Sequence, residues 1–136
     1  MKRRLFVLPI PSTQFGGGGA SLVDNEIRFE YQRGGAYYRG ALRFKRVCAT
    51  RTRNEPFCTL FHLEDAYDTL VEIAPSPWLE EVRRDSAAWA ERYRDPMAWH
   101  HYMVYLDSSG CFEVIAEGWE QLPEKPGRWS TPRAPS

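Results

Sequence analysis

Two adjacent histidines, His100 and His101, are the residues whose type most readily supports acid–base catalysis or metal binding. Neighbouring side chains of a β-strand point to opposite faces, so a single metal ion cannot easily bind both. His62 is distant in the sequence and could join either of them only through the tertiary fold. We therefore expect one histidine in solvent at the start of a strand and the other in a buried polar network, with no metal site and no cofactor.

A nucleophilic cysteine is the second chemistry to consider, with Cys111, His101 and either Asp107 or Glu113 as its parts. Such a site needs the thiolate and the imidazole within hydrogen-bond reach of each other. Residues 107–110 read Asp-Ser-Ser-Gly, which is typical of a hairpin turn. This turn would place His101 and Cys111 toward opposite ends of a strand that rises about 3.3 Å per residue. We therefore expect Cys111 to be a small apolar core residue.

The cysteines of the chain, Cys48, Cys58 and Cys111, are odd in number and have no CxxC spacing. Together with the lack of an export signal, this pattern is typical of reduced thiols in a cytoplasmic protein. Whether Cys48 and Cys58 pair across a hairpin stays open, because the sequence does not contain their geometry.

The charge of the 136-residue chain is balanced overall but divided along its length. Residues 1–53 carry 11 Lys/Arg and 3 Asp/Glu, a net charge of +8, and residues 54–136 carry 7 and 15, a net charge of −8. The zero total argues against a dedicated nucleic-acid-binding protein. No run of about 20 apolar residues is present, so we expect no membrane span. We expect the two halves to be partly separated in space, which would orient a protein partner or allow copies to associate through opposite charges.

Six basic residues lie between Arg39 and Arg53, close to several aromatic residues. Arg39, Arg43 and Lys45 share one face of the predicted strand. This pattern is compatible with a platform for single-stranded nucleic acid, on which bases stack and phosphates meet cations. The favoured interpretation is a solvated outer face whose charge is balanced by Glu26, Glu30 and the acidic half of the chain.

Two carboxylates and two tryptophans near the end of the chain are further candidates for a binding surface. Glu113 and Glu117 share a predicted strand face four residues apart, which is farther than the spacing of a retaining glycosidase pair. We interpret them as a solvated acidic face. Trp119 and Trp129 could anchor a partner, because exposed aromatic residues anchor interfaces, or could be covered if the tail folds back over the core.

The periodicity of the sequence predicts an α+β fold with one mainly antiparallel, curved sheet of about seven strands and one principal helix. Strands are expected at residues 5–8, 26–32, 37–50, 57–63, 67–73, 101–106 and 111–117. A bulge at Lys45 and Arg46 would keep the apolar residues of the long strand on one side. Ser76 and Pro77 are typical of a helix start, and the helix is expected over 77–93 with Trp78, Val82, Trp89 and Tyr93 on one face. A Gly-rich loop at 12–20 belongs to a single domain, 1–122, and a Pro-rich irregular tail follows at 123–136.

The second part of the chain, about residues 57–119, resembles a group of small bacterial proteins, some of which belong to toxin–immunity loci. The resemblance rests on Ser-Pro-Trp-Leu at 76–79, which opens a helix after a strand, and on the hairpin segments His-Tyr-Met-Val-Tyr at 101–105 and Glu-Val-Ile at 113–115. It implies a compact protein that acts by binding a partner, and it implies no catalytic residue.

These features together predict a non-enzymatic protein-binding module, such as an immunity or regulatory protein that masks its partner. The expected binding residues are Arg39, Arg43, Lys45, Glu113, Glu117 and Trp119. One alternative is a small hydrolase or ligand-binding protein that uses His62 or His101 at a pocket of the sheet. A second alternative is single-stranded nucleic-acid binding through the segment from Arg39 to Arg53.

Overall fold

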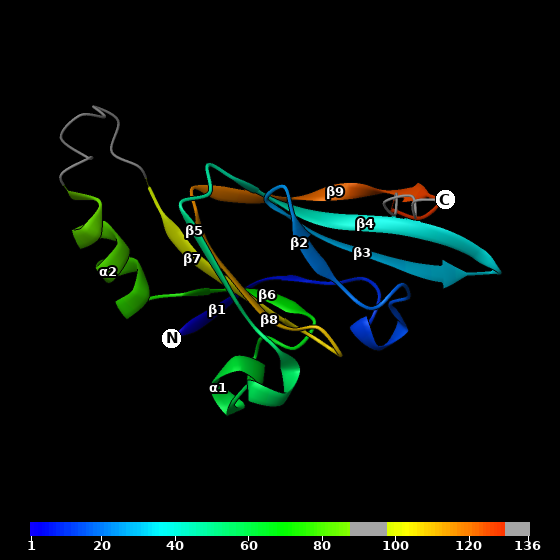
Figure 1. Cartoon of the computed structure of the whole chain (residues 1–136), viewed down its shortest axis with the longest axis horizontal. Helices are drawn as coiled ribbons and strands as arrows, with labels where there is room; N and C mark the ends of the chain where they lie inside the picture. Colours follow the sequence, from blue (N-terminus) through cyan, green and yellow to red (C-terminus); the bar gives the residue numbers. More distant parts are fainter. Residues whose placement is uncertain (88–97, 130–136) are drawn as a thin grey trace, which may run out of the picture.

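The structure is a computed structural model that describes residues 1–87 and 98–129. Its described part contains two antiparallel sheets instead of one, with nine strands instead of about seven (Figure 1). Sheet A has the order β1-β6-β7-β8-β5, and sheet B has the order β2-β3-β4-β9. The strands of sheet A are β1 (Lys2–Val7), β6 (Thr69–Ile73), β7 (His100–Leu106), β8 (Gly110–Ala116) and β5 (Ala49–Arg53). Those of sheet B are β2 (Ser21–Val23), β3 (Glu26–Arg33), β4 (Ala36–Lys45) and β9 (Gly118–Pro126).

The main core lies between the two sheets. Sheet B contributes residues such as Ile27 and Leu42, and sheet A contributes residues such as Val104 and Val114. A second apolar cluster, which includes Met103, lies on the opposite face of sheet A. The central strands β7 and β8 are therefore buried on both faces, as the apolar run at 101–106 predicts.

Short helices lie on the face of sheet A that points away from sheet B (Figure 1). They are η2 (Glu55–Phe57) and α1 (Leu60–Leu63) at one end, and α2 (Pro77–Asp85) at the other; a 3-10 turn, η1 (Ser12–Gln14), precedes β2. The predicted start of α2 is confirmed, because the Ser76 side chain accepts a hydrogen bond from the Leu79 N–H at 3.0 Å. α2 ends at Asp85 with Ser86 as its C-cap, and residues 88–93 of the predicted helix, which include Trp89 and Tyr93, lie outside the described residues.

The long strand predicted at 37–50 is in fact two strands in different sheets. β4 ends at Lys45 in sheet B, Arg46 takes a positive φ of 51°, and β5 begins at Ala49 in sheet A. The change of apolar parity at this point therefore comes from a change of sheet, and the predicted bulge is wrong.

The strand predicted at 57–63 is also wrong, because this segment forms η2 and α1. The Thr59 N–H donates to His62 Nδ1 at 2.9 Å, and His62 N–H donates to the Thr59 carbonyl at 2.9 Å. These local bonds close a helical turn and override the alternating pattern. Residues 57–63 and 67–73 consequently do not form a hairpin, and β6 pairs instead with β1 and β7.

The segment predicted as an irregular tail begins as regular structure. β9 continues through residues 123–126, and its prolines are tolerated because β9 is an edge strand of sheet B. Residues 130–136 of the predicted tail lie outside the described residues. In the described part of the chain, no helix is both long and apolar enough to span a membrane.

The basic and acidic halves of the chain are interleaved, in contrast to the expected partial separation. Three basic strands each pair with a strand of the acidic half: β1 with β6, β4 with β9 and β5 with β8. Ion pairs follow these ladders, including Arg3–Glu72 at 2.6 Å and Arg46–Glu117 at 3.0 Å. The charge division along the sequence therefore becomes pairing between neighbouring strands.

Candidate functional site

The predicted basic residues lie on the outer face of sheet B. Arg39, Arg43 and Lys45 share this face, as the alternation predicts. Arg43 Nε donates to Glu26 at 2.8 Å, and Lys45 Nζ lies 3.4 Å from Glu120. Burial raises the pKa of Glu26, but hydrogen bonds from Arg43 and Arg28 outweigh it and leave that pKa below its ordinary value. Carboxylates therefore already neutralise Arg43 and Lys45, as expected for a solvated outer face.

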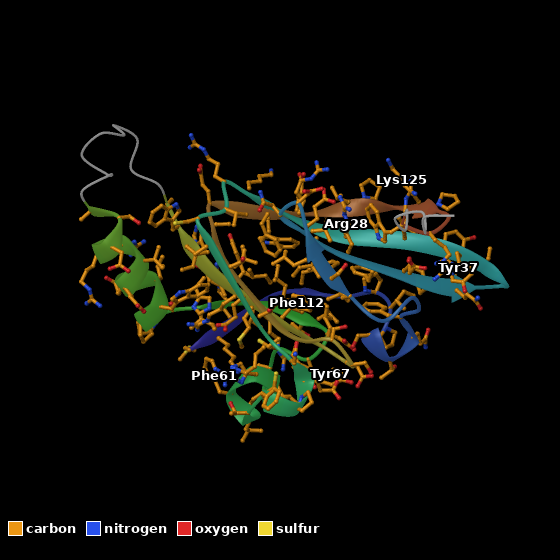
Figure 2. All side chains as sticks on the ribbon, viewed as in Figure 1. Arg28, Tyr37, Phe61, Tyr67, Phe112 and Lys125 are labelled. Carbon is orange, nitrogen blue, oxygen red and sulfur yellow. The ribbon has the colours of Figure 1, made fainter. Side chains whose placement is uncertain are left out.

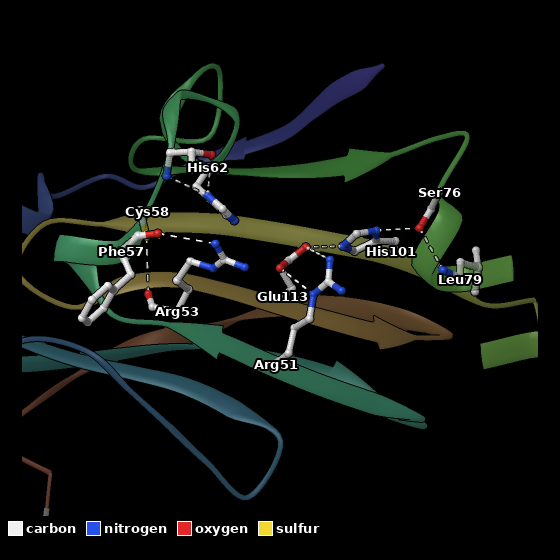
Figure 3. A network of polar contacts seen from close by, with 10 residues as sticks. Arg51, Arg53, Phe57, Cys58, His62, Ser76, Leu79, His101 and Glu113 are labelled. Carbon is white, nitrogen blue, oxygen red and sulfur yellow. Dashed lines mark hydrogen bonds and ion pairs between the residues drawn. The ribbon is translucent and has the colours of Figure 1, made fainter. Parts of the chain in front are cut away.

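The two predicted acidic residues occupy different environments. Glu117 is partly exposed and pairs with Arg46. Glu113 is only 4% exposed, so its assignment to a solvated face is wrong. It projects from β8 onto the outer face of sheet A, between α1 and α2, where other side chains cover it (Figure 3).

The two tryptophans near the end of the chain both pack against the protein. Trp119 is partly buried and lies against the main core, with its ring centroid 5.6 Å from that of Phe6. The Trp129 Nε1–H donates to the carbonyls of Phe29 at 2.9 Å and Gly40 at 3.2 Å. The chain thus folds back over sheet B, which is the covered alternative.

A buried polar chain links α2 to three strands of sheet A (Figure 3). Ser76 Oγ lies 2.7 Å from His101 Nδ1, and His101 Nε2 lies 2.7 Å from Glu113 Oε1. Arg51 binds both carboxylate oxygens of Glu113, at 2.7 and 3.0 Å. Every member is satisfied when His101 Nε2–H donates to the carboxylate and the Ser76 hydroxyl donates to Nδ1.

The hydrogen-bonded series Ser76–His101–Glu113 has the order of a serine nucleophile, a base and an orienting carboxylate. Its environment differs from that of an open active site, because Ser76 is 4% exposed and His101 is 3% exposed. The Ser76 oxygen also caps α2. The ring of Trp78 lies edge-on to the ring of His101, and the guanidinium carbon of Arg51 lies 4.1 Å from the centroid of the Trp78 ring. In this arrangement the buried polar network fixes the start of α2 to the sheet, and the Ser76 hydroxyl is not exposed to a substrate.

The histidines behave as the sequence predicts. His101 lies in the buried network, and the neighbouring His100 is partly exposed, with Nδ1 2.5 Å from a Glu72 oxygen. His62 lies elsewhere, within α1, where burial first and then Arg53 lower its pKa. His62 and His101 therefore belong to different ends of the same sheet face (Figure 3).

The cysteine arrangement also matches the prediction. Cys111 pairs with Tyr105 and His101 pairs with Ile115, so the ladder places the thiol and the imidazole well apart. Cys111 is 1% exposed, and burial raises its pKa to about 12, which keeps the thiol protonated. Cys48, Cys58 and Cys111 are all free thiols.

Because the pKa of Glu113 is lowered in the folded protein, we expect the free energy of unfolding to decrease in acid. Burial raises this pKa, but hydrogen bonds from His101 and Arg51 outweigh it and lower it from 4.5 to about 2. A lowered carboxyl pKa stabilises the fold at pH values above 4.5 and ceases to do so as the pH falls toward 2. We expect a loss of about 3 kcal/mol in this window.

Urea unfolding between pH 7 and pH 2 measures this loss, with Glu113→Gln as the comparison. The free energy of unfolding of the wild type should approach that of the variant as the pH falls. Parallel pH profiles of the two proteins would show that Glu113 has an ordinary pKa.

The structure also contains an apolar surface that the sequence reading missed. Four large side chains of η2, α1 and the turn that follows α1 are exposed: Phe57 by 70%, Leu60 by 74%, Phe61 by 50% and Tyr67 by 40%. We call these four residues the apolar patch. The interpretation of 57–63 as a half-buried strand concealed it, whereas the Thr59-x-x-His62 capping pair was the signal for a helical turn.

Among the described residues, no group of three or more His, Cys, Asp or Glu side chains is placed to hold a metal ion. Comparison with known proteins finds no protein-family model, no curated protein and no solved structure that matches the chain.

Proposed function

We propose that the protein is a non-enzymatic binding module of immunity or regulatory type, which masks another protein by contacting it through the apolar patch. The observation that carries this proposal is the concentration of exposed apolar side chains. Seven large hydrophobic side chains are exposed in the described residues, and four of them belong to the patch. Clustered exposed apolar residues mark interaction surfaces, whereas scattered ones need no explanation.

The segment that carries the patch is held in place by long-range contacts. The Glu55 carboxylate accepts the Ser108 N–H, and Lys2 Nζ donates to the carbonyls of Phe61 and of Glu64, the latter at 2.6 Å. These bonds join the segment to β1 and to the β7–β8 turn. A surface ordered before binding loses less conformational entropy on association, which favours a binding role.

The charges of the molecule indicate which partner fits. The carboxylates that lie on strands of the acidic half all pair with cations of the basic half: Glu72, Glu113, Glu120 and Glu124. We therefore do not expect the affinity for a partner to come mainly from an acidic surface that attracts a basic protein. We propose instead that the partner offers an apolar groove, into which Phe57 and Leu60 insert as anchors.

Capture of a partner from native lysate tests this proposal with two matched variants. The first is Phe57→Ser with Leu60→Ser, which removes the two most exposed patch residues. The second is Val7→Ser with Val23→Ser, which removes exposed apolar side chains elsewhere. We expect a discrete partner to be retained by the wild type and the Val variant and lost, by roughly 100-fold in affinity, from the Phe57/Leu60 variant.

Two results would contradict the proposal. The same proteins could be captured by both variants, which would place the interface elsewhere. Alternatively, light scattering could show a wild-type dimer that the Phe57/Leu60 change converts to a monomer, which would make a second copy the occupant of the patch.

A further inference from the structure

A cavity of about 380 Å³ opens on the outer face of sheet B, on the opposite side of the protein from the apolar patch. Arg28 of β3, Arg39 and Arg43 of β4, Lys125 of β9 and the indole of Trp129 line it. Figure 2 shows Arg28 and Lys125 on this face, turned away from the core. The volume is within the range of about 300–1,000 Å³ that is typical of small-molecule sites.

The charges around the cavity are unbalanced. Four cationic side chains line it, and Glu26 is the one carboxylate among the lining residues. Glu26 is already shared between Arg28 Nε at 3.0 Å and Arg43 Nε at 2.8 Å. The carboxylate of the site therefore has no remaining capacity for the other two cations.

Those two cations, Arg39 and Lys125, are direct partners in the β4–β9 ladder. Like charges opposite each other on neighbouring strands destabilise a sheet. Glu30 faces Arg39 on the other side, in the β3–β4 ladder, but it binds Arg128 instead. Within the described residues, neither Arg39 nor Lys125 forms an ion pair with a carboxylate; Arg39 donates to the Arg128 carbonyl at 3.2 Å.

Trp129 supplies the apolar wall of the cavity. Its N–H bonds to the Phe29 and Gly40 carbonyls hold the indole against the sheet. The guanidinium carbons of Arg28 and Arg39 lie 4.5 and 5.4 Å from the ring centroid. The site thus places a fixed aromatic surface beside a pair of unneutralised cations.

We propose that this cavity binds a small organic phosphate of about mononucleotide size. Its phosphate lies between Arg39 and Lys125, and its organic part packs against Trp129. Arginine and lysine together suit a phosphate, because the guanidinium binds two oxygens and the ammonium adds a point charge. The bound anion would remove the repulsion between the two cations, so binding would also stabilise sheet B.

Calorimetric titration with three probes tests the ligand class. The probes are inorganic phosphate, AMP and the uncharged nucleoside adenosine. We expect AMP to bind more tightly than inorganic phosphate and adenosine not to bind, because charge and the organic part both contribute. Failure of AMP and phosphate to bind at millimolar concentration would overturn the proposal, and so would tighter binding of a single-stranded oligonucleotide than of AMP at equal salt.

Two variants and one control test the residues. Arg39→Gln and Lys125→Gln should each weaken AMP binding by roughly tenfold, the effect of losing one charged hydrogen bond. Lys45→Gln removes a cation on the same face of β4 that is paired with Glu120 and is not a lining residue, so it should leave binding unchanged. An equal effect of all three would show non-specific attraction only.

A final variant separates the proposed binding role from a structural role. Lys125→Glu converts the like-charged pair into an opposite-charged pair, so it should raise the melting temperature without ligand while abolishing AMP binding. A lower melting temperature would mean that Lys125 serves the fold and would overturn the assignment.

Discussion

Replacing Glu113 by alanine is expected to lower the free energy of unfolding by about 3–5 kcal/mol. The carboxylate is buried and accepts hydrogen bonds from His101 Nε2 and from two nitrogens, Nε and Nη2, of the Arg51 guanidinium. Its removal leaves the His101 Nε2–H without an acceptor at a position that water does not reach. Arg51 is about half exposed and can be rehydrated, so most of the loss comes from His101.

Urea unfolding at pH 7 measures the effect, with two variants for comparison. Glu113→Gln keeps an oxygen that can accept from His101 and should cost about half as much. Glu117→Ala removes a partly exposed carboxylate of the same strand region and should change stability by less than about 1 kcal/mol. A loss at Glu113 no larger than at Glu117 would mean that the buried network does not stabilise the fold.

The strands that form local hairpins were predictable from the sequence. Ile27, Phe29 and Tyr31 alternate with polar residues, and the Gly34-Gly35 turn joins β3 to β4 in a hairpin. The Ser76 cap and the left-handed Gly110 turn also follow from local residue chemistry. In each case the signal and its structural consequence lie within a few residues of each other.

Features that depend on distant partners were not predictable. Near Lys45 and Arg46 the apolar residues change from even-numbered to odd-numbered positions. This change fits a bulge and a change of sheet equally well, and only the pairing of β5 with β8 distinguishes them. Glu113 alternates with Phe112 and Val114 like an exposed strand residue. Its burial goes with its bonds to His101 of the neighbouring strand and to Arg51, which is 62 positions away in the sequence.

The candidate sites show the same limit. Arg39 was identified as a basic surface residue, but its unneutralised state depends on Lys125 across the ladder and on Glu30 bonding to Arg128. The apolar patch was hidden because Phe57 and Phe61 fit a strand pattern as well as a helical one. Short alternating segments carry this ambiguity until tertiary contacts resolve it.

Replacing Gly110 by alanine is expected to destabilise the protein by about 4 kcal/mol and to loosen the segment that carries the apolar patch. Gly110 has a φ of +102°, which a side chain strains, and an added Cβ would collide with the Arg53 carbonyl and lie 2.9 Å from the Glu55 nitrogen. Both contacts are backbone atoms at the junction of β5 and η2, so relief requires η2 to move.

Gly35→Ala is the matched control, because Gly35 has a φ of +81° and no atom within 4 Å of the added Cβ. Urea unfolding should show a larger loss for Gly110→Ala, and amide exchange should be faster at Phe57, whose N–H binds the Asn54 carbonyl at 2.9 Å. Equal losses for the two glycines would mean that backbone strain alone acts and that β8 does not position the patch.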